Sequence, residues 1–454
     1  MTLRLSLAIV GLGLAPIALA APFTPGNLVI YRVGDGVNML TNRGNPVFLD
    51  EYTTNGVLVQ SIMLPTNAVD GGYPLIASGT ATSEGLLTRS ADGRYLVFMG
   101  YGTNLGGASI LSDSTSTAIP RVIGRVDYLG TVNTTTALTN FASGNNPRSA
   151  ATDNGTNFWV GGAGTVAAAP GGIAFATLGT NRAVVVSTNP VSNIRQVAIF
   201  DGQLYASTAS GTAFRIGKVG TGLPTGDSVV VTPLPGIPTN AGSPYAFVLL
   251  NLTGGAEPDT LYVADDTFNT IIKFSRVGGV WVSNGAIAAS GVRGLTATVS
   301  VTGATTNVHL YATTGAGTAA GGGSLYAAVD AAGYNAPPSV TNATVIATAA
   351  PRTAFRGIAF APIGPTMPPP LEPPHVIGLT ITNYDVTLIW AAQPGTTNFV
   401  QAASTPDGSV VPAAFADISG PIEIVGAGQV ITNWTEPDGA TNQPARYYRI
   451  RAIR

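Results

Sequence analysis

The chain has 454 residues, of which 10% are charged, and its formal net charge is −2. This sparse charge excludes a protein that binds nucleic acid electrostatically, and the 45% of hydrophobic residues excludes an intrinsically disordered chain. The absence of cysteine excludes disulfides and a thiol nucleophile.

The first 20 residues have the pattern of a secretion signal. Arg4 supplies a positive start, Leu5 to Leu14 is an apolar run, and Ala18-Leu19-Ala20 is a small-residue cleavage site. We therefore predict a signal peptide at residues 1–20 and export to the cell surface or the extracellular space. A cysteine-free exported chain of this length favours a bacterial source. No later segment predicts a transmembrane span.

A short apolar strand recurs along residues 21–362, and its first position is usually arginine. Its copies start at Arg148, Arg195, Tyr245, Arg293 and Arg356. The first four copies are each followed by an aromatic strand. A repeat of about 40–60 residues made only of strands predicts an all-β array, most often a β-propeller.

The strand pattern divides this region into repeats. Five predicted blades span residues 84–140, 147–188, 194–234, 244–289 and 292–349. Residues 27–64 supply three more strands, and Arg356 to Ala361 supplies a lone innermost strand. Pairing these two ends makes a sixth blade and removes open sheet edges. Six blades are favoured, and seven remain an alternative. Turns are predicted at Asp92-Gly93, Asn154-Gly155, Asp201-Gly202 and Asn284-Gly285.

One of these blades carries a family resemblance. The segment from Asp259 to Phe274, with its Leu-Tyr-Val-Ala-Asp-Asp core, resembles the turn between the middle strands of NHL-type propeller repeats. The other blades keep only the aromatic strand. The resemblance therefore extends to the six-bladed propeller class.

A proline-rich stretch, residues 363–374, predicts a semi-rigid linker. Residues 375–454 then show about six strands, which predicts a small C-terminal β-sandwich. Trp390 and the closing strand from Arg446 to Ala452 resemble fibronectin type III or immunoglobulin-like modules of secreted bacterial proteins. The cysteine pair of antibody domains and a last edge strand are missing.

The recurrent arginine is the best candidate for a ligand site. In a propeller the innermost strands line the central channel, so Arg148, Arg195, Tyr245, Arg293 and Arg356 are predicted to surround one mouth. Guanidinium groups bind carboxylate, sulfate or phosphate in a bidentate manner. The alternative is structural, because a repeated polar residue can bond backbone carbonyls of the neighbouring blade. In the remaining blade Leu86 takes the place of the arginine.

Other chemistry is weakly supported. Asp265 and Asp266 are possible calcium ligands, although turn formation explains them equally well. His309 and His375 have no partners for a metal centre or a catalytic triad nearby in the sequence. We assign no catalytic residue, no metal and no cofactor.

Function follows only indirectly from these features. The favoured hypothesis is a non-enzymatic binding or scaffold protein that recognises a glycan or a protein. One alternative is an extracellular polysaccharide lyase or hydrolase with its site at the channel mouth. Another is a subunit of a surface layer or fibre. Oligomeric state and ligand identity are not predicted.

Overall fold

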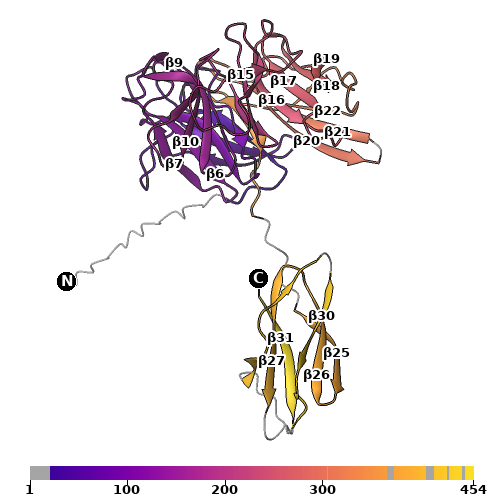
Figure 1. Cartoon of the computed structure of the whole chain (residues 1–454). Coiled ribbons are helices and arrows are strands. Elements are labelled where there is room, and N and C mark those ends of the chain that lie inside the picture. Colours follow the sequence, from indigo (N-terminus) through magenta and orange to yellow (C-terminus); the bar gives the residue numbers. More distant parts are fainter. Residues whose placement is uncertain are drawn as a thin grey trace, which may run out of the picture. The chain divides into compact units, whose positions relative to one another are not determined.

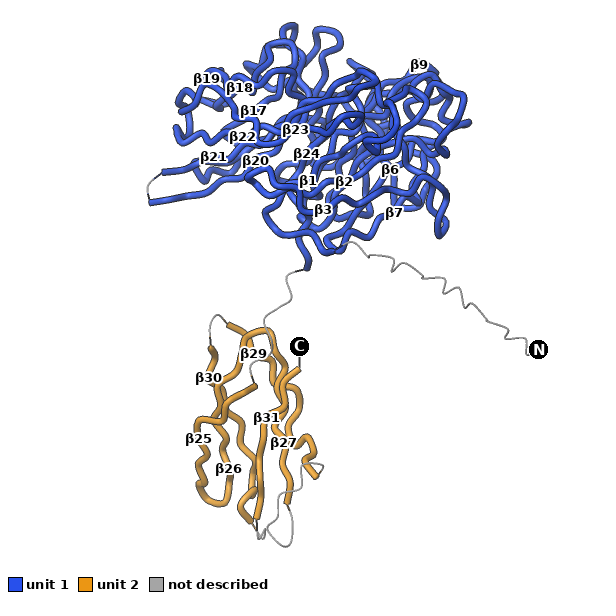
Figure 2. Tube along the Cα trace, turned by 180° about the vertical axis from the view of Figure 1, so that it is seen from behind, with its two compact units in different colours: residues 1–365 blue, residues 366–454 orange. Residues whose placement is uncertain are grey.

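The computed structural model describes residues 21–303, 305–365, 373–404, 414–426, 429–441 and 445–453. Two compact units divide the chain, residues 1–365 and 366–454 (Figure 2). The predicted signal peptide, residues 1–20, and residues 366–372 of the predicted linker lie outside the described residues. Within the described part, no helix is long and apolar enough to span a membrane.

Six four-stranded antiparallel sheets build the described part of the first unit (Figure 1). The first contains β24 (Ala354–Phe360), β1 (Leu28–Val33), β2 (Val47–Tyr52) and β3 (Leu58–Met63), and the second β4 (Thr88–Arg89), β5 (Tyr95–Tyr101), β6 (Arg121–Asp127) and β7 (Val132–Leu138). The third contains β8 (Pro147–Thr152), β9 (Asn157–Val166), β10 (Ala169–Thr177) and β11 (Val184–Ser187).

The remaining three sheets follow the same order along the chain. The fourth contains β12 (Val197–Phe200), β13 (Gln203–Ser207), β14 (Ile216–Val219) and β15 (Val231–Pro233), and the fifth β16 (Pro244–Leu250), β17 (Thr260–Asp265), β18 (Thr270–Val277) and β19 (Val280–Ala288). The sixth contains β20 (Gly294–Thr302), β21 (Thr305–Thr313), β22 (Ser324–Asp330) and β23 (Thr344–Thr348). This confirms the predicted all-β propeller and its six blades.

The ring closes through a blade shared by both ends of the unit. Strand β24 pairs antiparallel with β1, so that Leu28 faces Phe360 and Val29 faces Ala359. The inner strands of this blade and the next approach closely at Gly357, whose N–H donates to Gly85 O at 2.9 Å. A Cβ at Gly357 would lie 2.2 Å from the backbone nitrogen of Leu87, so only glycine fits.

Turn chemistry explains most of the predicted connections. Asp201 and Gly202 join β12 to β13, and both have positive φ angles, 47° and 69°, as a two-residue hairpin turn requires. The prediction of a turn at Asn284-Gly285 is wrong. These residues lie inside β19, where the register against β18 shifts and Gly285 adopts a φ of 118°. The dipeptide therefore forms a β-bulge, another structure that accepts glycine at positive φ.

Apolar side chains pack between neighbouring blades. Tyr31 of β1 contacts Phe98 of β5 edge-on, with 5.6 Å between ring centroids, and both are fully buried. Trp159 of β9 is likewise buried and belongs to an apolar cluster with Val197 and Leu204 of the fourth blade. Because each blade buries one face against the next, the blades hold their inner strands around a common axis.

A buried ion pair connects the fifth and sixth blades. Lys273 of β18 and Asp330 of β22 are completely buried, and Nζ lies 2.8 Å from Oδ2. Lys273 also donates to Gly333 O, and the Tyr262 hydroxyl donates to the same Asp330 oxygen at 2.7 Å. Burial opposes ionisation, but the hydrogen bonds from Lys273 and Tyr262 lower the pKa of Asp330 overall.

The second unit is a two-sheet β-sandwich. One sheet holds β25 (His375–Thr382), β26 (Asp385–Ala392) and β30 (Val430–Glu436); the other holds β28 (Ala416–Asp417), β27 (Thr396–Ser404), β29 (Ile422–Ile424) and β31 (Arg446–Ile453). Trp390 is fully buried between them and donates from Nε1 to Asn398 Oδ1 at 2.8 Å. The predicted C-terminal sandwich is thereby confirmed, while its assignment to the fibronectin type III class stays a prediction.

The Lys273–Asp330 pair generates a stability prediction. We expect Lys273→Met to lower the free energy of unfolding by about 3–5 kcal/mol at neutral pH, because it leaves a buried carboxylate uncompensated. The matched control is Lys218→Met, since Lys218 is the only other lysine and is exposed on β14. Urea denaturation monitored by tryptophan fluorescence measures both.

The stability contributed by the Lys273–Asp330 pair depends on pH. Because the folded-state pKa of Asp330 is depressed, its contribution to stability is present above the unfolded-state pKa and is lost as the pH falls through the folded-state value. The difference between wild type and Lys273→Met should therefore shrink on acidification. Equal stability of the two proteins at neutral pH would contradict this account.

Candidate active site at the channel mouth

The structure brings the five predicted site residues to one end of the inner strands. Arg148, Tyr245 and Arg356 lie near the starts of β8, β16 and β24, while Arg195 and Arg293 immediately precede β12 and β20. Five blades thus each contribute one side chain to this mouth. We call these five residues the mouth ring.

Tyr245 lies between two guanidinium groups. The guanidinium carbon of Arg195 lies 3.8 Å from the centroid of the Tyr245 ring, and that of Arg293 lies 4.6 Å from it. Cations favour the electron-rich face of an aromatic ring, so each contact stabilises the stack. The hydroxyl-bearing ring is thereby held between two positive charges.

Asp266 joins the same two arginines. Its Oδ2 accepts from Arg293 Nη2 at 2.8 Å and Nε at 3.0 Å, and its Oδ1 lies 3.8 Å from Arg195 Nη1. The side chains of Arg195 and Arg293 keep 17% and 24% of their surface exposed, so a ligand can reach them. Arg195, Tyr245, Asp266 and Arg293 form what we call the stacked cluster.

Arg148 and Arg356 are held more deeply. Arg148 Nη1 bonds to Asn193 Oδ1 and to Ile194 O at 3.3 Å, both just before the inner strand of the next blade. Arg356 Nη2 donates to Gly79 O at 3.0 Å, which precedes the second blade. Burial lowers the pKa of each guanidinium to about 10, and the Nε atom of each has no hydrogen-bond partner in the described structure.

These arginine side chains therefore form hydrogen bonds with the neighbouring blade. Arg195 follows the same pattern, since its Nη1 donates to the backbone oxygen of Ser243 at 3.1 Å and to that residue's hydroxyl at 2.5 Å. These bonds are the structural role that the sequence left open as an alternative. They coexist with an exposed stacked cluster, so the same side chains hold the blades together and line the mouth.

Glu84 completes the mouth in the second blade, which has Leu86 instead of arginine at the mouth-ring position. It is buried and accepts hydrogen bonds from the Tyr101 hydroxyl at 2.6 Å, from Asn146 Nδ2 and from Ser78 N at 3.2 Å. Burial raises its pKa, although these donors and the charge of Arg356 oppose that shift. Sequence reasoning missed Glu84 because it belongs to no motif. Its position two residues before Leu86, the mouth-ring equivalent, is the one available signal.

The remaining candidates occupy turns or lie elsewhere. Asp265 accepts from the backbone nitrogens of Ser243, Thr267 and Phe268. His309 lies beside the Ser300 hydroxyl on paired strands, and His375 belongs to the second unit. Within the described residues, no cluster of three or more histidine, aspartate or glutamate side chains is arranged to hold a metal ion.

Comparisons with known proteins yield structural matches alone. No protein-family model matches this sequence, and no match was found among curated proteins. The periplasmic gluconolactonase PpgL of Pseudomonas aeruginosa is 11% identical, with 89% of this chain and 98% of that chain covered at a TM-score of 0.37. The soluble aldose sugar dehydrogenase of Escherichia coli is 12% identical, with 67% and 99% covered at a TM-score of 0.37.

These comparisons correct our favoured functional hypothesis. We expected a non-enzymatic binding or scaffold protein, and the two matched structures, a gluconolactonase and a sugar dehydrogenase, contradict that expectation. The mouth also differs from the predicted ring of four arginines and Tyr245. It contains the carboxyl groups of Glu84 and Asp266 beside the guanidinium groups, and such ionisable pairs are what acid–base catalysis uses.

Blade-crossing bonds generate a second stability prediction. Arg356→Met removes the donors to Gly79 O, Ala316 O and Phe355 O, and we expect it to lower the free energy of unfolding by about 2–4 kcal/mol. Arg43→Met changes an exposed arginine and should shift stability by less than about 0.5 kcal/mol. Urea midpoints of both variants test this. A wild-type midpoint for Arg356→Met would refute the bridging role.

Proposed function

We propose that the chain is an exported enzyme that cleaves a carboxylate-bearing polysaccharide by β-elimination at the mouth ring. The observation that carries the proposal is the stacked cluster, in which Arg195 and Arg293 hold Tyr245 between them and remain reachable from solvent. Two guanidinium groups beside one proton-bearing group match what elimination from a uronic acid requires.

The chemistry explains this match. Elimination removes the proton on the carbon next to the sugar carboxylate, forms a carbon–carbon double bond and breaks the bond to the leaving glycosidic oxygen. The proton is acidic enough only when the carboxylate charge is neutralised, and a bidentate guanidinium supplies that neutralisation. In this proposal Arg195 and Arg293 bind the carboxylate. The Tyr245 oxygen accepts the proton from carbon as its own hydroxyl proton passes to the leaving glycosidic oxygen.

Asp266 has a positioning role in this scheme. Its carboxylate bonds to Arg293 through two nitrogens and lies within 4 Å of Arg195, so it fixes both planes on either side of Tyr245. It also offsets one of the two positive charges of the stacked cluster when no substrate is bound. The carboxylate of an incoming substrate then replaces Asp266 as the acceptor of hydrogen bonds from the guanidinium groups.

Hydrolysis is the second candidate, and one observation favours it. The pKa of Glu84 is raised by burial, so its carboxyl group has the character of a general acid. The three hydrogen bonds that it accepts fix the orientation of this carboxyl group. A glycoside hydrolase would use this acid together with Asp266.

The proposal also covers the location of the protein, the resemblance of its fifth blade and the role of its C-terminal sandwich. An exported location rests on the predicted signal peptide at residues 1–20, and we retain the NHL-type resemblance of the fifth blade as a proposal. The C-terminal sandwich, which keeps the resemblance to fibronectin type III modules, is assigned here to substrate or surface attachment.

Product analysis tests the proposal. The full chain is incubated with polygalacturonate, alginate and hyaluronan, and both new reducing ends and ultraviolet absorbance of unsaturated uronate are followed. We expect both signals to rise together on at least one polymer. Reducing ends without absorbance would replace elimination by hydrolysis, and no cleavage of any polymer would overturn both.

A point substitution isolates the proton carrier. Tyr245→Phe keeps the ring between the two arginines and removes only the hydroxyl, so we expect kcat to fall by about 100-fold or more with unchanged urea stability. Tyr73→Phe, at an exposed site on the same unit, should retain full activity. Undiminished kcat in Tyr245→Phe would remove this residue from the mechanism.

A further inference from the structure

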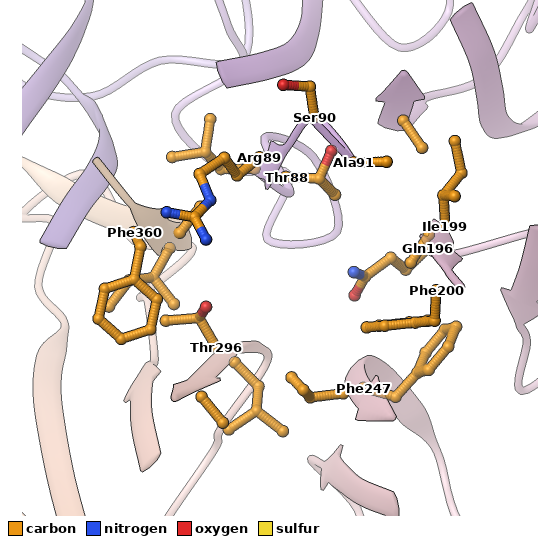
Figure 3. A pocket seen from close by; sticks show the side chains of 18 of the residues that line it. Thr88, Arg89, Ser90, Ala91, Gln196, Ile199, Phe200, Phe247, Thr296 and Phe360 are labelled. Atoms are coloured by element: carbon orange, nitrogen blue, oxygen red, sulfur yellow. The ribbon is translucent and has the colours of Figure 1, made fainter. Parts of the chain in front are cut away.

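The end of the channel opposite the mouth ring contains a cavity of about 220 Å³. Inner strands from all six blades line it, toward the ends of those strands (Figure 3). A dry protein cavity of about 150 Å³ is large enough to hold benzene. This space therefore accommodates one six-membered ring with small substituents.

Arg89 supplies a cation without a counter-ion. It lies on β4 and its side chain is exposed to the cavity, where Nη1 reaches Ala361 O only at 3.4 Å. None of the described residues that line the cavity is acidic. Burial within the channel lowers the pKa of Arg89, and no carboxylate opposes that shift. A guanidinium with accessible donors and no carboxylate partner is able to bind an anion.

Gln196 offers a second polar contact. It lies just before β12, keeps 5% of its surface exposed, and its Oε1 is buried without a hydrogen-bond partner. Its backbone nitrogen donates to Ser207 Oγ at 3.1 Å, so the main chain there is fixed. Figure 3 shows the side chains of Arg89 and Gln196 entering the cavity from opposite sides. The unpartnered oxygen can accept a hydrogen bond from a ligand in the cavity.

Aromatic side chains form the walls between these two groups. Phe200 and Phe247 pack with 5.8 Å between ring centroids, and the ring of Phe360 lies 6.0 Å from the guanidinium of Arg89. The labelled side chains of all three surround the cavity in Figure 3. Aromatic walls favour a planar, apolar ligand body over a fully hydroxylated chain.

We propose that this cavity binds a single-ring aromatic carboxylate that bears a hydroxyl group. The carboxylate pairs with Arg89, the ring packs among Phe200, Phe247 and Phe360, and the hydroxyl donates to Gln196 Oε1. The site lies at the other end of the channel from the mouth ring, so it is independent of the proposed catalytic activity. Its occupant would be a second ligand, distinct from the polysaccharide.

Calorimetric titration of the full chain tests this with four probes. We expect 4-hydroxybenzoate to bind, benzoate to bind up to about tenfold more weakly, and uncharged 4-hydroxybenzamide to bind about 10- to 100-fold more weakly. Gluconate carries the carboxylate and hydroxyls without a ring. Gluconate binding as tight as that of 4-hydroxybenzoate, or equal binding of the amide, would overturn the assigned class.

Two variants and a control locate the site. Arg89→Met should weaken 4-hydroxybenzoate by about 10- to 100-fold, and Gln196→Leu should weaken it to the level of benzoate. Both retain the strand backbone bonds, and Gln196→Leu removes no side-chain bond that the structure contains. Arg94→Met, at an exposed position on the same blade, should bind as wild type. Unchanged affinity in Arg89→Met, or no binding by the wild-type chain, would refute the proposal.

Discussion

The propeller depends on guanidinium groups that have been withdrawn from water along its central axis. A buried cation destabilises a fold unless its donors find acceptors, and here the acceptors are main-chain oxygens of the neighbouring blade. Arg148 bonds ahead of β12, Arg195 ahead of β16, and Arg356 ahead of β4. Arginine side chains therefore join three of the six pairs of neighbouring blades at their innermost edges.

This constraint divides the channel into two chemically different ends. At the mouth ring the positive charge of four arginines is partly offset by Asp266 and Glu84, and several guanidinium donors bond to main-chain oxygens. At the opposite end Arg89 has neither an acidic neighbour nor a full set of acceptors. The mouth-ring end combines cations with proton-bearing groups and is suited to chemistry. The opposite end is suited to holding an anion.

The sequence predicted the ring and the residues at its mouth because both leave a local pattern. Five of the six inner strands repeat an Arg-led or Tyr-led apolar segment. The strands at residues 27–64 lacked an inner partner and the strand at residues 356–361 lacked outer ones, so the two ends had to share a blade. Asn284-Gly285 was misassigned because glycine at positive φ serves a bulge as well as a turn. Glu84 and Arg89 were not predicted as site residues. Their roles depend on neighbours that are distant in the sequence, and no local pattern indicates these contacts.

The function was harder to infer from the sequence than the fold or the site residues. Arginine in a repeat predicts cation placement, but it does not reveal that Asp266 lies between two of those cations or that Tyr245 is stacked by both. Those relations join three blades separated by dozens of residues. The choice between binding and catalysis depends on such encounters, which the sequence does not record.

A crystal structure of the full chain soaked in bromide measures the central claim most directly, because anomalous scattering locates each anion. Because Arg89 has no carboxylate partner, we expect a strongly occupied bromide site beside it. A weaker site is expected beside Arg195 and Arg293, where bromide competes with Asp266. A channel free of bromide at both ends would contradict the account.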